Sequence, residues 1–161
     1  MFAYIPARIG SKRIPKKNIK LLGDKPSICH VIESLILCKG LNGIAVSTDS
    51  PEILEITRRY PKVVTLERRE ESLSDDTSGF MDLVKHDLKR FCSYFNDDEV
   101  IFTLATSALI GPSDYEQAIQ EFQSNRDGLT FSVTKLEHQP RLALELNSDG
   151  TLSALDKPAY L

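Results

Sequence analysis

The amino-acid sequence predicts an α/β fold with a doubly wound, mostly parallel sheet and a C-terminal hairpin extension. Short apolar runs typical of strands alternate four times with segments whose apolar residues recur at helical spacing. The run at 44–47 is continuously apolar up to its last residue, as expected for a strand covered by helices on both faces. Right-handed crossovers between such strands produce a parallel sheet. With 161 residues the chain is long enough for one domain of this kind and too short for two.

The first half of the chain contains three expected strands and two expected helices. The second helix has Ser50 as its N-cap and Pro51 at its first position, where proline is favoured. The expected elements, in order, are a strand at 2–5, a turn at 21–26, a helix at about 27–39, a strand at 44–47, a helix ending near 60–61 and a strand at 62–66.

The second half continues the alternation and ends in a hairpin. A capping box at 113–116 predicts the start of its second helix. The turn sequence Asn-Ser-Asp-Gly at 147–150 predicts the hairpin. The expected elements are a helix opening at 75–78, a strand at 99–104, a helix from 113, a fifth strand at 129–133, and hairpin strands at 141–146 and 151–155.

Composition limits the class of partner and the compartment. The formal net charge of −3 excludes a nucleic-acid polyelectrolyte, and no apolar run approaches the length of a membrane span. No signal peptide pattern precedes Arg8. Cys29, Cys38 and Cys92 are odd in number and form no C-x-x-C pair, so we expect buried free thiols. These observations together predict a cytoplasmic protein.

The strongest chemical signal is the segment 5–18, which follows the first strand. Gly10 allows a bound group to approach the backbone, while Ser11 and the neighbouring amides can donate hydrogen bonds. Pro6 and Pro15 restrict the backbone. This composition favours a polyanion, and its place after a first strand suggests a nucleoside triphosphate. The alternatives are a solvated charged turn and a basic localisation or nucleic-acid patch. We call residues 8–18 the basic loop, and its cations are Arg8, Lys12, Arg13, Lys16 and Lys17.

Four sequence blocks carry a resemblance to a known family. They are Ile-Pro-Ala-Arg-x-Gly-Ser-Lys-Arg-Ile-Pro-x-Lys-Asn at 5–18, Val-Ser-Thr-Asp-Ser at 46–50, Arg-Glu-Glu-Ser-Leu-Ser-Asp-Asp-Thr at 69–77 followed by His86, and Ala-Thr-Ser-Ala-Leu at 105–109. In this order they resemble the acylneuraminate cytidylyltransferases, also called CMP-sialic acid synthetases. The family usually has Gln-Pro-Thr-Ser-Pro-Leu-Arg at the last block. The absence of that arginine here is more similar to the pseudaminic-acid branch.

The resemblance implies a Rossmann-like nucleotide-diphospho-sugar transferase fold and a cytidylyltransferase activity. Such an enzyme joins a nine-carbon sugar acid, N-acylneuraminate or a relative, to CTP and releases pyrophosphate, which supplies surface-glycan synthesis. It also implies Mg²⁺ bridging the phosphates, with ligands that this sequence leaves unknown. Two alternatives remain open: a catalytically incomplete nucleotide-binding homologue, and a cytidylyltransferase for another keto sugar acid, such as the eight-carbon acid of lipopolysaccharide.

The resemblance also implies a domain organisation. Members of the family continue through further strands and a final helix that carries an aspartate pair. We therefore expect one nucleotidyltransferase domain over 1–161, truncated at its C-terminus, with 137–161 as a candidate dimerisation extension of a homodimer.

Residue roles follow from the same blocks. The expected catalytic residues, which hold triphosphate oxygens, are Arg8, Lys12 and Lys17. The expected nucleotide-binding residues are Ala7, Gly10, Ser11, Asn18, Arg69, Asp76, Thr77 and Ser78. The expected sugar-binding residues are Thr106 and Ser107.

Simpler structural roles compete with some of these assignments. Helix capping explains Asp49, with metal binding as the minor alternative. For Asp76 and Thr77, which are also good caps, capping and ligand contact have equal weight and are compatible. Arg69 also has acidic neighbours with which to form surface pairs.

The remaining candidates have similar alternatives. Thr106 and Ser107 have a plain role in ending a strand, and no adjacent base activates Ser107 as a nucleophile. His86 lies within a helix, and we do not expect it to act as a base.

Overall fold

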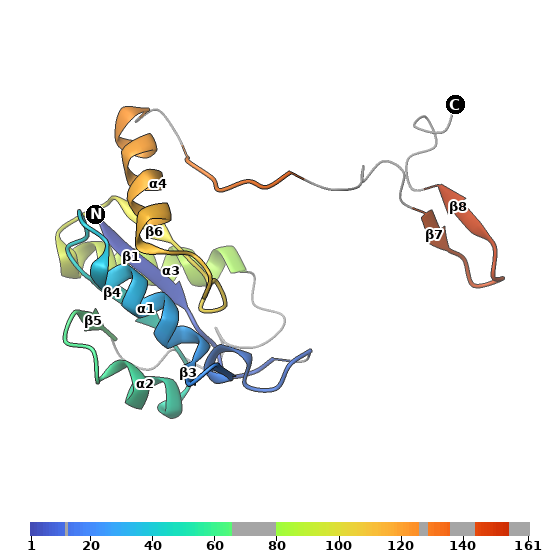
Figure 1. The fold of residues 1–161 in the computed structure, drawn as a ribbon, viewed down its shortest axis with the longest axis horizontal. Helices are drawn as coiled ribbons and strands as arrows, with labels where there is room; N and C mark the ends of the chain where they lie inside the picture. The colour runs from blue at the N-terminus through green and yellow to red at the C-terminus, as the bar shows by residue number, and fades with distance from the viewer. Residues whose placement is uncertain (12, 66–79, 126–128, 136–143, 155–161) are drawn as a thin grey trace. The chain divides into compact units, whose positions relative to one another are not determined.

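A computed structural model describes residues 1–11, 13–65, 80–125, 129–135 and 144–154, with side chains of the third range from residue 84 onward. The chain divides into two compact units, Met1–Thr130 and Phe131–Leu161. The first unit holds a four-stranded parallel sheet with the strand order β5-β4-β1-β6 (Figure 1). The second holds an antiparallel hairpin. The predicted α/β class, the parallel sheet and the C-terminal hairpin are therefore confirmed.

Strand β1 (Phe2–Pro6) is the centre of the sheet. It pairs in parallel with β4 (Ile44–Ser47) on one side and with β6 (Val100–Phe102) on the other. The edge strand β5 (Val63–Val64) pairs with β4. The amide of Ala7 donates a 2.8 Å hydrogen bond to the carbonyl oxygen of Ser47, which extends the β1–β4 ladder to the start of the basic loop.

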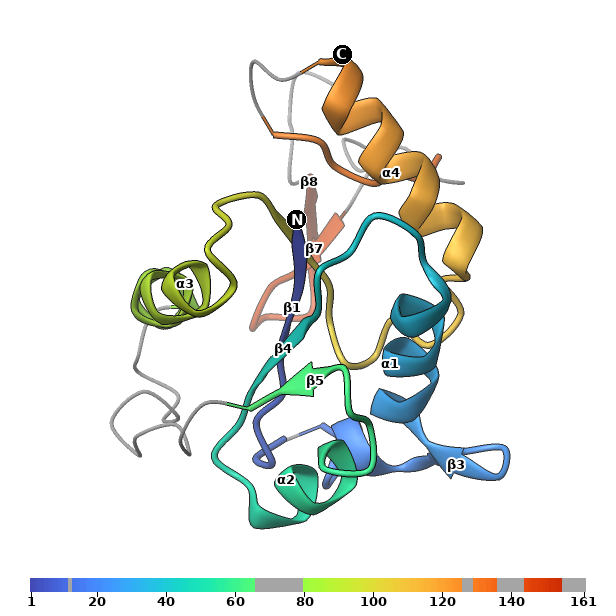
Figure 2. The same cartoon turned by 90° about the vertical axis from the view of Figure 1, so that its left-hand side faces the viewer.

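Four helices cover the two faces of this sheet: α1 (Ser27–Leu37), α2 (Pro51–Thr57), α3 (Phe80–Phe95) and α4 (Pro112–Ser124). Figure 2 shows α3 on one side of the strands and α1 and α4 on the other. Ala3 and Ile5 belong to the larger core, which also contains residues of α1, α2 and α4. Phe2 and Tyr4 pack with Phe91 of α3 in the smaller core. Because successive side chains of β1 enter opposite cores, the strand is apolar on both faces.

The starts of two helices test the capping predictions. The Oγ of Ser50 accepts a 3.3 Å hydrogen bond from the amide of Ile53, which confirms Ser50 as the N-cap of α2. Helix α4 begins earlier than predicted, with Gly111 as its N-cap and Pro112 at its first position. Asp114 reaches back to accept a 2.8 Å hydrogen bond from the Gly111 amide. The predicted box at 113–116 is therefore wrong by two residues, because Pro112 already supplies a helical φ.

The connection between β1 and α1 contains more structure than the predicted turn. It includes the 3-10 helix η1 (Lys17–Ile19) and a small antiparallel pair, β2 (Leu21–Leu22) and β3 (Lys25–Pro26). Gly23 has a φ of +68° between these two strands, a conformation that glycine adopts at low cost.

The C-terminal unit contains the predicted hairpin, formed by β7 (Leu144–Leu146) and β8 (Leu152–Ala154). The predicted strand at 129–133 is wrong, because residues 129–135 are described and form no strand. Their apolar side chains are exposed, with Val133 at 91%. Alternating apolar residues become a strand only where a neighbouring strand accepts their hydrogen bonds. The prediction of one domain over 1–161 stays a prediction.

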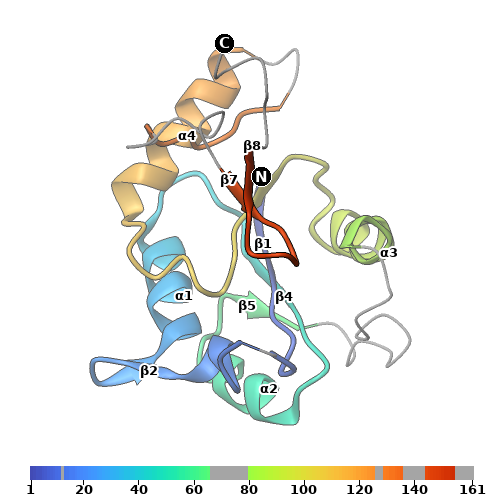
Figure 3. The ribbon, with the colours of Figure 1, turned by 90° about the vertical axis from the view of Figure 1, so that its right-hand side faces the viewer.

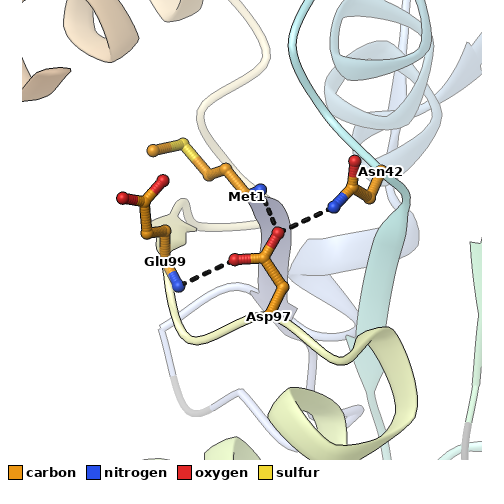
Figure 4. Close-up of polar contacts among 4 residues, drawn as sticks. All are labelled: Met1, Asn42, Asp97 and Glu99. Atoms are coloured by element: carbon orange, nitrogen blue, oxygen red, sulfur yellow. Dashed lines mark hydrogen bonds and ion pairs between the residues drawn. The ribbon is translucent and has the colours of Figure 1, made fainter.

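Asp97 connects three segments at the amino edge of the sheet (Figure 4). Its carboxylate accepts hydrogen bonds from the terminal amino group of Met1, from Asn42 Nδ2 at 2.7 Å and from the Glu99 amide at 3.0 Å. The bond from the amino group is the main cause that lowers the pKa of Asp97. The start of β1 is thereby attached to the chain before β4 and before β6.

Candidate functional site

The candidate site is the basic loop, which leaves β1 at the carboxyl edge of the parallel sheet. Because β1 and β4 are parallel neighbours, the connections that follow them emerge side by side. Figure 3 shows the chain after β1 next to the start of α2 at this end of the sheet. Ligands of open α/β sheets bind beyond this edge, and the basic loop lies there.

Two hydrogen bonds hold the beginning of the basic loop. The side-chain amide Nδ2 of Asn18 donates to the carbonyl oxygen of Arg8 at 2.8 Å. The amide of Ile9 donates to Oδ1 of Asp49 at 2.9 Å. Asn18 is 9% exposed, although most of the loop around it is open to solvent. The backbone of the loop is therefore held at Arg8 and Ile9.

Most of the described cations of the basic loop are open to solvent. Arg13, Lys16 and Lys17 are exposed, and Arg8 is half-buried. Lys16 Nζ contacts Glu52 Oε1 of α2 at 2.6 Å, an exposed pair of the kind that contributes little to stability. These cations can bind an anion that approaches from solvent.

The backbone of the loop is also accessible near its middle. A Cβ added to Gly10 would meet no heavy atom within 4 Å, so a ligand has room beside this residue. Ser11 is half-buried beside it. Ala7 lies in the core with its amide bonded to Ser47.

The turn after β6 carries Thr106 and Ser107 at the same edge of the sheet. The Ser107 amide donates to the carbonyl oxygen of Leu104 at 2.9 Å. The buried hydroxyl of Ser27, at the start of α1, donates to the carbonyl oxygen of Ala105 at 3.0 Å. The bond from Ser27 therefore attaches this turn to α1. Thr106 is exposed and Ser107 is half-buried, so both side chains are accessible to a ligand.

Five of the predicted site residues lie outside the described residues, and their roles stay predictions: Lys12, Arg69, Asp76, Thr77 and Ser78.

The structure adds residues that sequence reasoning assigned otherwise or missed. Asp49 does not cap α2 as predicted, because Ser50 makes that bond and Asp49 contacts Ile9 instead. The sequence signal for this contact was the position of Asp49 just after a strand parallel to β1.

A buried polar pair lies on the α3 face of the sheet. The hydroxyl of buried Tyr4 donates to Oδ2 of Asp87 at 2.7 Å. The other oxygen of Asp87 lies 3.3 Å from Nδ1 of His86.

The described part of the chain does not form a metal site of its own. Within it, no three His, Cys, Asp or Glu side chains come together closely enough to hold an ion. The same part contains no helix that is both long and apolar enough to cross a bilayer. Its three cysteines are free thiols, as predicted, with Cys29 and Cys38 buried and Cys92 half-buried.

Comparisons with known proteins find a family and several relatives that match this chain. The family model described as cytidylyltransferase matches residues 2–159. The chain is 31% identical over 157 residues to a pseudaminic acid cytidylyltransferase of Campylobacter jejuni, covering 97% of this chain and 67% of that protein. It is 33% identical over 155 residues to a CMP-N,N'-diacetyllegionaminic acid synthase of Legionella pneumophila, covering 94% of this chain and 65% of that protein.

A solved structure of CMP:2-keto-3-deoxy-manno-octonic acid synthetase complexed with CTP superimposes with a TM-score of 0.61 at 27% identity. The match covers 78% of this chain and 48% of that one. The chain thus spans about two thirds of the length of these two curated relatives, and about half of this structural neighbour.

Proposed function

Because this chain belongs to the cytidylyltransferase family, we propose that it transfers the cytidylyl group of CTP to a nine-carbon keto sugar acid. The products are a CMP-sugar and pyrophosphate. The observation that carries the proposal is the family match over residues 2–159, which includes the whole basic loop.

The proposed reaction needs positive charge more than it needs a protein nucleophile. The anomeric hydroxyl of the sugar acid attacks the α-phosphorus of CTP, and the bond from that phosphorus to the bridging oxygen of pyrophosphate breaks. Negative charge increases on the phosphoryl oxygens and on the leaving group. Arg8 supplies a planar pair of donors for two oxygens, and Lys17 supplies a compact charge. The remaining contribution of the protein is to hold the two substrates in line.

The choice of sugar acid rests on the relatives. Proteins named for pseudaminic and legionaminic acid match 97% and 94% of this chain. A 3-deoxy-manno-octulosonate cytidylyltransferase of Hydrogenovibrio crunogenus is 29% identical over 84% of it. We therefore place a nine-carbon acid first and the eight-carbon acid second. Thr106 and Ser107, at the end of β6, are the proposed contacts to the sugar.

We propose Mg²⁺ as the companion of CTP. This cation keeps several of its waters and is bound through substrate phosphates with one or two carboxylates, so it does not require a preformed cage. When bound, it would neutralise charge on the phosphates. We also propose a cytoplasmic location, which the three free thiols support.

The hairpin supports a proposal of homodimerisation. Leu144, Leu146 and Leu152 share one face, because Leu146 pairs with Leu152 and Leu144 with Ala154. These leucines are 52%, 70% and 61% exposed. A two-stranded hairpin is marginally stable alone, so this apolar face is suited to packing against a second copy. Light scattering on the wild type and on Leu146→Glu tests this; a wild type that is monomeric at every concentration would exclude the dimer.

The proposed activity is tested with the wild-type protein, CTP, MgCl₂ and a panel of sugar acids. We expect pyrophosphate release with a nine-carbon acid, and a larger rise in melting temperature with CTP than with ATP. A lack of stabilisation by CTP at millimolar concentration would refute CTP as the nucleotide. A protein that binds CTP but releases no pyrophosphate with any acid is the catalytically incomplete homologue.

A further inference from the structure

We propose that Asp49 and Asn18 are positioning residues that together hold the peptide group between Arg8 and Ile9, and that this fixed peptide orients the basic loop for the nucleotide. The inference rests on the proposed function, since it concerns the same loop. It adds Asp49, and it gives Asn18, already an expected nucleotide-binding residue, a second role that acts through the backbone.

The two hydrogen bonds at the start of the loop involve a single peptide group. The carbonyl oxygen of Arg8 accepts from Asn18 Nδ2 at 2.8 Å, and the amide of Ile9 donates to Asp49 Oδ1 at 2.9 Å. In a trans peptide these two groups point in opposite directions. Asn18 and Asp49 therefore hold the same plane from opposite sides, and a rotation of that plane would break both bonds.

The two holding side chains are themselves well supported. Asp49 lies between Thr48 and Ser50, each 2% exposed. The Ser50 amide donates to Thr48 Oγ1 at 3.1 Å, and Ser50 caps α2. Asn18 lies within η1 and is 9% exposed. The peptide group is thus attached to two ordered segments: η1, which follows β1, and the connection between β4 and α2.

The orientation of this peptide decides where the functional groups next to it point. Turning the peptide plane changes the ψ angle of Arg8. The orientation of the plane therefore sets the direction in which the Arg8 side chain leaves the backbone. It likewise sets the start of the open segment at Gly10, where a ligand has room. A peptide group held this way does not have to be ordered when the anion arrives, which saves binding free energy.

Asp49 is a carboxylate beside a proposed triphosphate site, so its negative charge has to be separated from its role as a hydrogen-bond acceptor. A carboxylate repels phosphate, so an acceptor without charge would serve the ligand better. The amide of asparagine has the same shape and can still accept from the Ile9 amide. Asp49→Asn therefore separates positioning, which it preserves, from metal binding or charge effects, which it removes.

The test uses Asp49→Ala, Asp49→Asn, Asn18→Ala and the control Glu55→Gln. Glu55 is an exposed carboxylate of α2, the helix that follows Asp49, and it pairs with Arg58 rather than with the loop. The readouts are the dissociation constant for CTP by calorimetry, the hydrogen exchange rate of the Ile9 amide by NMR, and the melting temperature as a check on folding.

We expect Asp49→Ala and Asn18→Ala each to weaken CTP binding about tenfold, the effect of one lost hydrogen bond to a charged or buried group. The Ile9 amide should exchange at least about tenfold faster in Asp49→Ala. Asp49→Asn should restore both values to within about threefold of wild type, and Glu55→Gln should match wild type. The double variant Asp49→Ala/Asn18→Ala should lose less than the product of the single losses, since both bonds hold one group.

Two results would overturn the inference. Unchanged CTP affinity in folded Asp49→Ala and Asn18→Ala would show that the held peptide does not serve the ligand. Asp49→Asn as weak as Asp49→Ala, with normal exchange of the Ile9 amide, would show that Asp49 acts through its charge. A wild type that binds no CTP would instead refute the proposed function, so the two failures are distinguishable.

Discussion

The side-chain amide of Asn18 donates a 2.8 Å hydrogen bond to the carbonyl oxygen of Arg8, ten residues earlier, and so closes the basic loop on itself. Asn18, the last residue of the segment 5–18, thereby holds the backbone of Arg8, the first cation of the basic loop. This contact gives Asn18 a structural role in addition to its predicted contact with the nucleotide. It also means that the spacing between the two residues matters as much as their identities.

Arg8→Lys keeps the positive charge and removes the planar pair of donors. We expect kcat/KM for CTP to fall about 10- to 100-fold, the cost of one or two hydrogen bonds to a charged group. Steady-state pyrophosphate release measures this. Arg59→Lys, at an exposed arginine of the same unit, is the matched control and should behave as wild type. An Arg8→Lys enzyme with wild-type kcat/KM would remove Arg8 from the proposed chemistry.

Ser27→Ala tests the attachment of the turn after β6. The Ser27 hydroxyl is buried and donates to the carbonyl oxygen of Ala105, so its loss should reduce the free energy of unfolding by about 1 kcal/mol. KM for the sugar acid should also rise, because Thr106 follows that carbonyl directly. Urea denaturation and steady-state kinetics measure the two effects. Ser124→Ala, at an exposed serine that bonds within α4, is the control; a rise in KM for CTP alone would contradict the placement of the sugar.

The carboxylate of Asp97 predicts a pH dependence of stability that is independent of the candidate site. Its pKa is lowered from the usual 3.8, first by the hydrogen bond from the terminal amino group. A lowered folded-state pKa contributes stability that is complete above the unfolded value and is lost as the pH falls through the folded value. We expect Asp97→Asn to be less stable than wild type at neutral pH.

The difference in free energy of unfolding between wild type and Asp97→Asn should shrink as the pH falls below 3.8, because the wild-type carboxylate becomes protonated. Chemical denaturation at a series of pH values measures it. A difference that is constant down to pH 2 would contradict the assigned cause.

Tyr4→Phe tests the hydrogen bond between β1 and α3. The Tyr4 hydroxyl donates to Oδ2 of Asp87 at 2.7 Å, and both residues are buried. Removing the donor leaves a buried carboxylate oxygen with one partner fewer, so we expect a loss of about 1.5–3 kcal/mol in the free energy of unfolding. Tyr94→Phe is the control, because Tyr94 is 58% exposed. Equal stability of the two variants would mean that water replaces the phenol at no cost.

Much of the fold was predictable because the signals are local. The alternation of strands and helices, the parallel sheet and the Ser50–Pro51 start of α2 follow from periodicity and capping chemistry within a few residues. The start of α4 was misplaced because two neighbouring cap signals compete there, and Pro112 with Gly111 prevails over Ser113. The segment 129–133 has the pattern of a strand but no strand, because pairing depends on a neighbour that a local pattern does not contain.

By itself, the sequence determined the class of the fold, the position of the basic loop after β1 and the kind of ligand that its cations favour. Only the tertiary structure decided which side chains hold that loop. Asp49 lies 40 residues from Ile9, and its assignment changed from helix cap to backbone acceptor once β4 was seen beside β1. The physical reason is that composition and spacing report charge and local conformation, whereas a hydrogen bond between two loops exists only when two parallel strands bring their ends together.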